Sequence, residues 1–304
     1  MQEKIKLTPA QRVAALEAKF SKVSEEGKSL LPVRHVNRDF FTCDLLDYAL
    51  KDDRASMEAP IFSLSTKRDT SIWSWSSQDG TRSLTVTPSV KGRATQHDKD
   101  VLIFIISQMT AARNKSPEAV ESRTVRFVVH NYLISTNRAT GGKEYERFVE
   151  SLERLQGTLI KTDIQTGGQR IQEGFGLIES WKTVERSPGN SKMVAVEIVL
   201  SRWLYNAVCN EEVLTLDEKY FRLRRPLARR LYELFRKHCG HQKRWKVGIE
   251  VLLRKTGSKS SLPEFKRMLK TIILEDDLPR YRLHLDEAKG QVLVYQKDMK
   301  LFAS

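Results

Sequence analysis

Cysteine is scarce in this chain: 304 residues contain only Cys43, Cys209 and Cys239. An odd, scattered set of cysteines provides neither a disulfide framework nor a pair with zinc-ligand spacing. The N-terminus lacks the apolar stretch of a secretory signal, and the longest apolar run, 101–106, is too short to cross a bilayer. These absences predict a protein of the reducing cytoplasm that has no membrane partner.

Motifs that carry catalysis are also missing. The sequence has no G-x-x-x-x-G-K-[ST] phosphate-binding loop and no His-hydrophobic-His pair of the kind that holds the metal of a nicking relaxase. The stretch 238–241 reads His-Cys-Gly-His, but no matching ligands lie nearby, and a histidine at a helix end suits the helix dipole. Asp276 and Asp277 are typical of a solvated turn. We therefore expect a protein that is not an enzyme and that has no metal and no cofactor.

Positive charge is abundant and unevenly distributed. The net charge is +14 and the isoelectric point is about 9.7. Residues 221–304 contain 21 Lys and Arg against 9 Asp and Glu, whereas residues 1–220 contain 31 against 29. Lysine and arginine on phosphates release condensed counterions, so a polyanionic partner is favoured. Nucleic acid is the first candidate and an anionic membrane surface the second.

Apolar periodicity divides the chain into three parts. Residues 1–58 contain a predicted helix over 8–24, followed by an irregular linker with possible short helices. This N-terminal helix either docks on a partner or packs on the body of the protein. Residues 59–212 and 213–304 each have the pattern of a packed domain, so we expect an α+β protein with two domains.

The first domain is expected to contain a helix–helix–hairpin order. The predicted helices and strands are strands over 61–65, 71–76 and 84–87, helices over 97–112, 131–136 and 143–156, and strands over 124–129, 158–164, 170–185 and 193–200. Two helices followed by a hairpin are typical of a winged helix.

The same order recurs in the second domain. It has predicted helices over 226–238, 247–255 and 261–274 and a hairpin of strands over 280–285 and 291–295. The sequence therefore predicts two tandem winged-helix domains, each a helix-turn-helix with a β-hairpin wing.

The helices over 247–255 and 261–274 form the strongest candidate for a DNA reader. Gly257 permits a tight turn between them, and Ser261 precedes Glu264 with the spacing of a capping box. A helix-turn-helix inserts its second helix into the major groove with the N-terminus leading. We therefore expect 261–274 to be the recognition helix.

The outer face of that helix is basic. Arg267 and Lys270 are placed to reach guanine edges or phosphates, and the amides near Ser260 would point at a phosphate. The alternative is an ordinary three-helix bundle with a charged face. The predicted DNA-binding residues of the second domain are Arg224, Arg225, Arg254, Lys255, Lys259, Ser260, Ser261, Glu264, Lys266, Arg267, Lys270, Thr271, Arg282 and Lys289.

Other arginines precede this pair of helices. Arg222, Arg229 and Arg230 lie before or on the helix over 226–238. Some of these side chains are expected to contact phosphate, and others to cover the core or to pair with Glu233.

The first domain is a weaker candidate for reading DNA. Its candidate DNA-binding residues are Lys143, Arg147, Lys161 and Arg170, and we expect the last two on the hairpin. The helix over 143–156 also exposes Glu144, Glu146, Glu150 and Glu153, which phosphate would repel. This domain either contacts DNA through its helix N-terminus and wing or serves mainly for dimerisation.

The second domain resembles a known family. The sequence reads YFRLRRPLARRLYEL at 220–234 and KTGS at 255–258, and both stretches resemble plasmid replication initiators of the RepA and TrfA type. The tandem winged-helix order over about 59–296 is similar to that group as well. The resemblance does not cover the N-terminal segment.

The resemblance implies a function on double-stranded DNA. Members bind repeated origin sequences (iterons), melt a nearby AT-rich region and recruit the host replicative helicase and initiator, and they exist as repressing dimers and initiating monomers. The main reader would then be the helix over 261–274. A winged-helix transcriptional regulator is the alternative, and a nicking or priming enzyme is disfavoured by the missing motifs.

Overall fold

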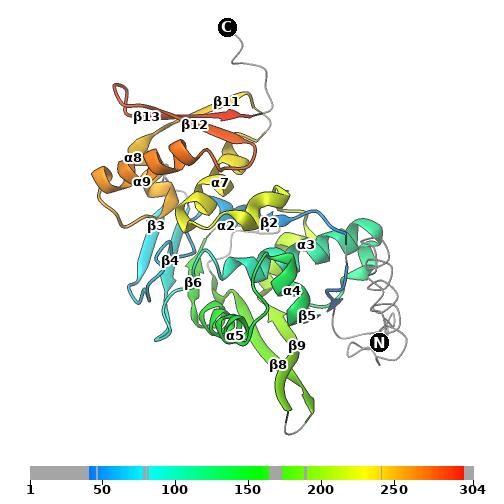
Figure 1. Ribbon diagram of the computed structural model, residues 1–304. Helices are drawn as coiled ribbons and strands as arrows, with labels where there is room; N and C mark the ends of the chain where they lie inside the picture. The colour runs from blue at the N-terminus through cyan, green and yellow to red at the C-terminus, as the bar shows by residue number, and fades with distance from the viewer. Residues whose placement is uncertain are drawn as a thin grey trace, which may run out of the picture. The chain divides into compact units, whose positions relative to one another are not determined.

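The computed structural model describes residues 41–45, 47–77, 80, 82–163, 173–187, 190–240 and 242–297, and the helix predicted over 8–24 lies outside them. Residues 41–58, which the sequence assigns to a linker, form short elements that pack on the body of the protein (Figure 1). These elements are β1 (Phe41–Thr42), β2 (Lys51–Asp53) and α2 (Arg54–Glu58). They escape sequence analysis because distant partners hold them: β1 pairs with β5 (Thr124–Val128), β2 pairs with β10 (Val213–Thr215), and Asp52 of β2 forms a buried ion pair with Lys99.

The first half is built around the buried helix α3 (Lys99–Lys115), whose apolar residues point in all directions. Around it lie the 3-10 helix η1 (Pro117–Ala119), β5 (Thr124–Val128), α4 (Val129–Ser135), α5 (Gly142–Gly157), β8 (Ile178–Ser187), β9 (Asn190–Leu200) and α6 (Arg202–Cys209). One sheet has the strand order β1-β5-β9-β8. Phe104 of α3 packs edge-on against Phe127 of β5, so helix and sheet share one core.

A second sheet of the first half has the order β3-β4-β6-β7. Its strands are β3 (Trp73–Ser76), β4 (Ser83–Thr87), β6 (Leu159–Thr162) and β7 (Glu173–Gly176). The single strand predicted over 170–185 is wrong, because the described chain passes from β7 in this sheet to β8 in the other. Where the chain passes from β7 to β8, the backbone of Gly176 lies against neighbouring backbone. A Cβ added at Gly176 would lie 3.0 Å from the carbonyl oxygens of Gln156 and Ile178. The strand predicted over 61–65 is also wrong, since only a single bridge joins Ser63 to Thr95.

The second half follows the 3-10 helix η2 (Glu218–Arg222). It contains α7 (Pro226–His238), β11 (Arg244–Gly248), α8 (Ile249–Thr256), α9 (Leu262–Glu275), β12 (Tyr281–Asp286) and β13 (Gln291–Gln296). The helix predicted over 247–255 begins at Ile249, because the residues before it pair with β13 as a strand. The sheet order is β11-β13-β12.

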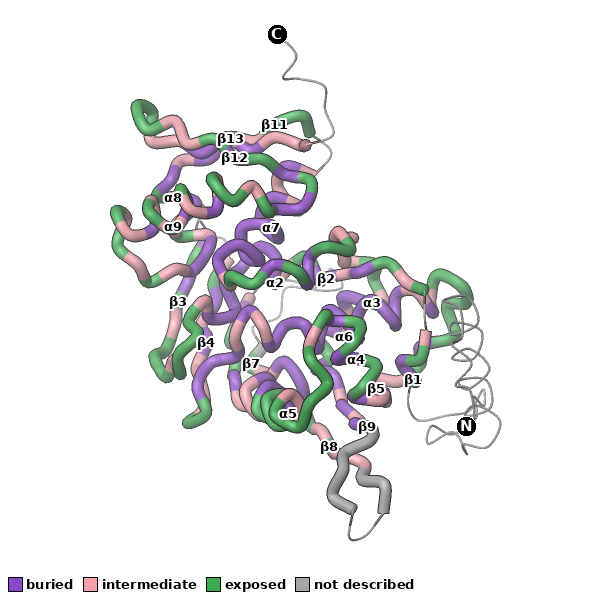
Figure 2. The backbone as a smooth tube through the Cα atoms, viewed as in Figure 1, coloured by how far each residue is buried: buried purple, intermediate pink, exposed green. Residues whose placement is uncertain are grey.

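The two halves share one order of elements: helix, strand, helix, helix, then a β-hairpin, with β6 and β7 inserted before the hairpin β8–β9 in the first half. In both, the strand before the second helix pairs with the last strand, β5 with β9 and β11 with β13. The predicted α+β class is confirmed. The first helices of the two halves, α3 and α7, are largely buried (Figure 2). Among the described residues, no helix combines the length and apolarity needed to span a bilayer.

Candidate nucleic-acid interface

The helix α9 is amphipathic and capped at its N-terminus. The Ser261 hydroxyl accepts a hydrogen bond from the Glu264 backbone amide at 3.5 Å, while Phe265, Leu269 and Ile272 are buried in the second core. The Glu264 carboxylate accepts two hydrogen bonds from Arg267, at 2.7 and 2.9 Å, so that it leaves the capping role to the serine. One face of α9 thus packs on α7 and α8 residues, and the other faces solvent.

The turn between α8 and α9 depends on glycine. Gly257 ends α8 with φ of +71°, in the left-handed region that disfavours other residues. A Cβ at this position would lie 2.4 Å from Cβ of Pro60. The turn is therefore pressed against the segment that follows α2, which fixes where α9 begins.

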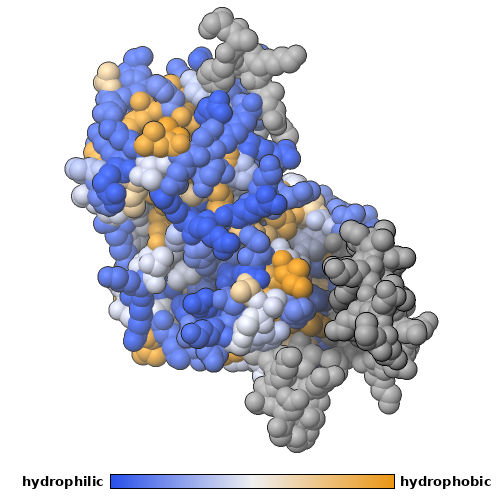
Figure 3. Space-filling view, in the orientation of Figure 1, coloured by the Kyte–Doolittle hydropathy of each residue, from blue (hydrophilic) through white to orange (hydrophobic). Residues whose placement is uncertain are grey.

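Exposed cations lie on the outer face of α9 and on the adjoining hairpin. Side chains of Arg267, Lys270, Arg282 and Lys289 retain 70%, 51%, 54% and 73% of their accessible surface. Lys270 on α9 lies 2.7 Å from Glu287 in the hairpin turn, so the helix and the hairpin present one continuous surface. Hydrophilic residues cover much of the molecular face on which α9 lies (Figure 3).

Each of these four cations faces a nearby carboxylate. Arg282 lies 2.8 Å from Asp276, and Lys289 lies 3.5 Å from Asp286. Exposed pairs of this kind contribute only about 0–1 kcal/mol, because water already solvates both charges. Phosphate oxygens can displace such carboxylates at little cost, so the pairs hold the cations near one surface without blocking them. Thr271 belongs to the same face and donates its hydroxyl hydrogen bond to the Arg267 carbonyl.

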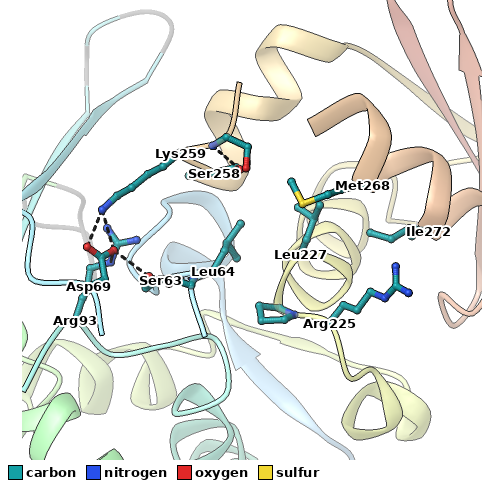
Figure 4. Close-up of a pocket in the computed structure, with 14 residues that line it drawn as sticks. Ser63, Leu64, Asp69, Arg93, Arg225, Leu227, Ser258, Lys259, Met268 and Ile272 are labelled. Carbon is teal, nitrogen blue, oxygen red and sulfur yellow. Dashed lines mark hydrogen bonds and ion pairs between the residues drawn. The ribbon is translucent and has the colours of Figure 1, made fainter. Parts of the chain in front are cut away.

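The turn between α8 and α9 is tied to a loop of the first half (Figure 4). The Lys259 ammonium donates to both Asp69 oxygens at 2.7 and 2.9 Å, and Ser63 donates to Asp69 at 3.0 Å. Burial alone would raise the pKa of Asp69, but the hydrogen bonds from Lys259, Ser71 and Ser63 outweigh it and hold that pKa well below its usual range. Beside this link lies a cavity of about 510 Å³. It is lined by Ser63, Leu64, Ser65, Asp69, Arg93, Arg225, Pro226, Leu227, Gly257, Ser258, Lys259, Ser260, Met268 and Ile272.

The remaining predicted cations of the second half divide into two groups. Lys255 is engaged within the protein, because its ammonium lies 2.8 Å from Glu58. Arg225 is 48% exposed and lies 2.5 Å from Glu275 at the surface, like the paired cations of α9 and the hairpin. Arg224 and Arg254 are exposed, and within the described part of the chain no carboxylate lies within 4 Å of either. Lys266 is partly exposed on α9.

In the first half the predicted DNA-binding residues that the structure describes lie on different elements, α5 and β6. Lys143 and Arg147 are exposed on α5, where Arg147 pairs with Glu144 of the same acidic face. Lys161 is exposed on β6, which pairs with β4 and β7 and is not part of the hairpin β8–β9. Lys161 thus lies on a hairpin, as predicted, but this hairpin is β6–β7, and its contact with DNA stays a prediction. Arg170 lies outside the described residues.

The arginines of α7 are structural. Arg229 and Arg230 are 3% and 2% exposed. Arg230 donates to the backbone carbonyls of Met57, Glu58 and Lys255 and lies 3.4 Å from Glu233, which confirms the predicted pairing. Arg229 forms an ion pair with Asp100 of α3. Neither side chain is available to phosphate.

The residues of the 238–241 stretch are occupied in other ways. His238 stacks on Trp245 at 4.9 Å and lies 3.2 Å from Glu58, while the buried Cys239 thiol donates to the Gln242 carbonyl. His241 lies outside the described residues.

Sequence analysis missed the residues of the first half that position α9. Asp69, Glu58 and Pro60 hold Lys259, Lys255 and Gly257 respectively. Each partner is some two hundred positions away along the chain, so no spacing or periodicity signals it.

Comparisons with known proteins identify the family. The sequence model of the family described as replication initiator protein A matches residues 51–283. A protein of Wigglesworthia glossinidia brevipalpis named "Putative replication protein" is 35% identical over 275 residues, which cover 90% of this chain and 98% of that protein. Two crystal structures of domains 2 and 3 of RctB share the fold with TM-scores of 0.57 and 0.53, at 13% and 12% identity. Each alignment spans 79% of this chain, and it spans 96% of the first RctB chain and 95% of the second.

The family match and the relative from Wigglesworthia extend over most of the chain, well beyond the motif at 220–234, and agree with it. The predicted resemblance to plasmid replication initiators is thereby confirmed, and the chain belongs to the replication initiator protein A family.

Proposed function

We propose that this initiator acts by sequence-specific binding to repeated duplex sites at an origin, with α9 as the reader. The observation that carries the proposal is the continuous surface of exposed cations on α9 and the hairpin β12–β13, joined through Lys270 and Glu287. The repeated order of elements and the matching strand orders support two tandem winged helices. Family membership supports DNA as the partner.

In this proposal α9 enters the major groove with its N-terminus leading. Arg267 and Lys270 contact guanine edges or phosphates, the amides near Ser261 bind a phosphate, and Arg282 on the wing contacts the backbone. The exposed side chains of Arg224, Arg254 and Lys289 support the backbone contact. The first winged helix adds auxiliary contacts or mediates dimerisation, since the acidic face of α5 disfavours a base-reading role.

The later steps follow from what the resemblance implies. Binding to iterons precedes melting of an AT-rich region and recruitment of the host helicase and initiator in the cytoplasm. The protein acts by assembly on DNA and carries out no catalytic step, and its dimer represses its own gene.

Footprinting on the replicon that encodes the protein tests this function. Protection of evenly spaced repeats is expected for an initiator. Protection of a single promoter palindrome would favour a transcriptional regulator, and strand cleavage at the protected site would favour a nicking enzyme. Either result would overturn the proposal.

A further inference from the structure

A second hollow lies on the other side of α8, between α2, the hairpin β3–β4 and α8. Its volume is about 600 Å³, and Glu58, Arg82, Arg254 and Lys255 line it together with the end of β3. The four charged residues come from three segments that lie far apart in the sequence. We refer to this hollow as the Glu58 pocket.

Positive charge in the Glu58 pocket exceeds negative charge. The Glu58 carboxylate is 5% exposed and has Lys255 at 2.8 Å, Lys237 at 2.9 Å and Arg82 at 3.7 Å. Arg254 lines the same hollow, so Arg82, Arg254 and Lys255 line it against the single carboxylate of Glu58 among its lining residues, while Lys237 approaches that carboxylate from outside the lining. One carboxylate cannot neutralise such a group, and the excess favours binding of an anion.

The arrangement separates cations that are held from cations that are free. Lys237 and Lys255 are 19% and 21% exposed and are fixed by short contacts with Glu58. Arg82 is 40% exposed and contacts Glu58 only at 3.7 Å, and Arg254 is exposed. The guanidinium group presents several donors in a plane, which matches the oxygens of a phosphate. Glu58 is thus a positioning residue, and the two arginines are the groups available to a ligand.

We propose that the Glu58 pocket binds a phosphate of the DNA backbone. Arg254 and Lys255 occupy the last turn of α8, directly before the turn that leads into α9. In a helix-turn-helix the helix before the reader crosses the DNA backbone, so a phosphate bound here belongs to the strand that flanks the groove entered by α9. The proposal rests on the proposed function, and it adds a contact from the β3–β4 hairpin of the first half.

The test is the double variant Arg82→Ala/Arg254→Ala in the full chain. Its affinity is measured over a series of salt concentrations on a duplex carrying the footprinted site and on a random duplex of equal length. We expect both affinities to fall by about tenfold, as for loss of a charge-assisted contact, and the salt slope to decrease by about 1. The ratio of the two affinities should stay unchanged, because a phosphate contact carries no sequence information.

The control removes two other exposed cations, with the same change in net charge. Lys115→Ala/Lys219→Ala alters the end of α3 and η2 and should leave both affinities within about twofold. Thermal unfolding of both double variants checks that the fold is kept. An equal loss in the control would overturn the pocket as a specific site.

Two further measurements distinguish a free phosphate from a phosphate of DNA, and a failure of this inference from a failure of the proposed function. Titration calorimetry with inorganic phosphate and with ATP measures binding of a free phosphate. If the arginine variant abolished that binding and left DNA affinity unchanged, the backbone assignment would be overturned. If the wild type failed to prefer the footprinted site, the proposed function would fail, while the loss on random DNA would still decide the role of the pocket.

Discussion

Lys99 of α3 and Glu233 of α7 form an ion pair of 3.0 Å in which neither side chain has any exposed surface. Asp52 lies 2.6 Å from the same ammonium, and the Tyr220 hydroxyl donates to Glu233 at 2.6 Å. Burial alone would lower the pKa of Lys99, but the facing carboxylates of Asp52 and Glu233 outweigh it and the pKa is raised. The first helices of the two repeated halves are therefore joined by a charged lysine inside the protein.

Removing that lysine should strongly destabilise the fold. Lys99→Met leaves Asp52 buried without a cation and leaves Glu233 only Arg230 at 3.4 Å, and we expect it to lower the free energy of unfolding by about 3–5 kcal/mol. Urea denaturation measures the change. The control is Lys182→Met, whose partner Glu197 lies 2.6 Å away but whose own side chain is 65% exposed, and it should cost less than about 1 kcal/mol. Equal losses in the two variants would show that the buried pair has no structural role.

The turn before α9 should not tolerate a side chain. Gly257→Ala combines a positive φ with a contact of 2.4 Å to Pro60, and we expect it to lower the free energy of unfolding by about 2–4 kcal/mol. Gly290→Ala is a matched control, because its φ is +59° but nothing lies within 4 Å of the added Cβ. It should cost about 1–2 kcal/mol, the conformational part alone. A larger loss at Gly290 than at Gly257 would contradict the packing of the turn on Pro60.

Stability should fall in acid in a way that depends on Glu58. Burial alone would raise the pKa of this carboxyl, but hydrogen bonds from His238 and Lys255 and the charge of Lys237 outweigh it and hold the pKa far below its usual value. Because the folded pKa lies below the unfolded one, about 4.3, the stabilisation is present above that pH and is lost as the pH falls. The difference in unfolding free energy between wild type and Glu58→Gln should therefore be largest near pH 7 and shrink below about pH 4. A difference that stays constant with pH would refute this assignment.

The long helices were predictable because each has a complete apolar stripe. Prediction and structure agree on 226–238 for α7 and differ by one residue at each end of α9. Capping by Ser261 and the glycine turn at Gly257 are local effects, which the sequence displays directly. The exposed cations of the reader follow from the same stripe, since they occupy the opposite face.

Elements stabilised by distant partners could not be predicted. Strand β2 pairs with β10, which lies more than a hundred residues further along the chain. Strand β11 forms because it pairs with β13, and the sequence around it does not show this pairing. The charge of a residue is also a misleading guide to its position, because charged residues usually lie at the surface. Arg229 and Arg230 look like surface cations in the sequence, yet carbonyl oxygens and carboxylates inside the protein bind both.

Sequence reading by α9 is the centre of this account, and Arg267→Ala tests it most directly. The measurement is the ratio of affinities for the footprinted duplex and a random duplex of equal length, at one salt concentration, with Lys115→Ala as the control. We predict that Arg267→Ala weakens binding to the footprinted duplex by about 1–3 kcal/mol, spares the random duplex and so lowers the ratio, whereas the control keeps it. An unchanged ratio, with equal losses on both duplexes, would mean that Arg267 contacts only phosphate and would contradict the assignment of α9 as the reader.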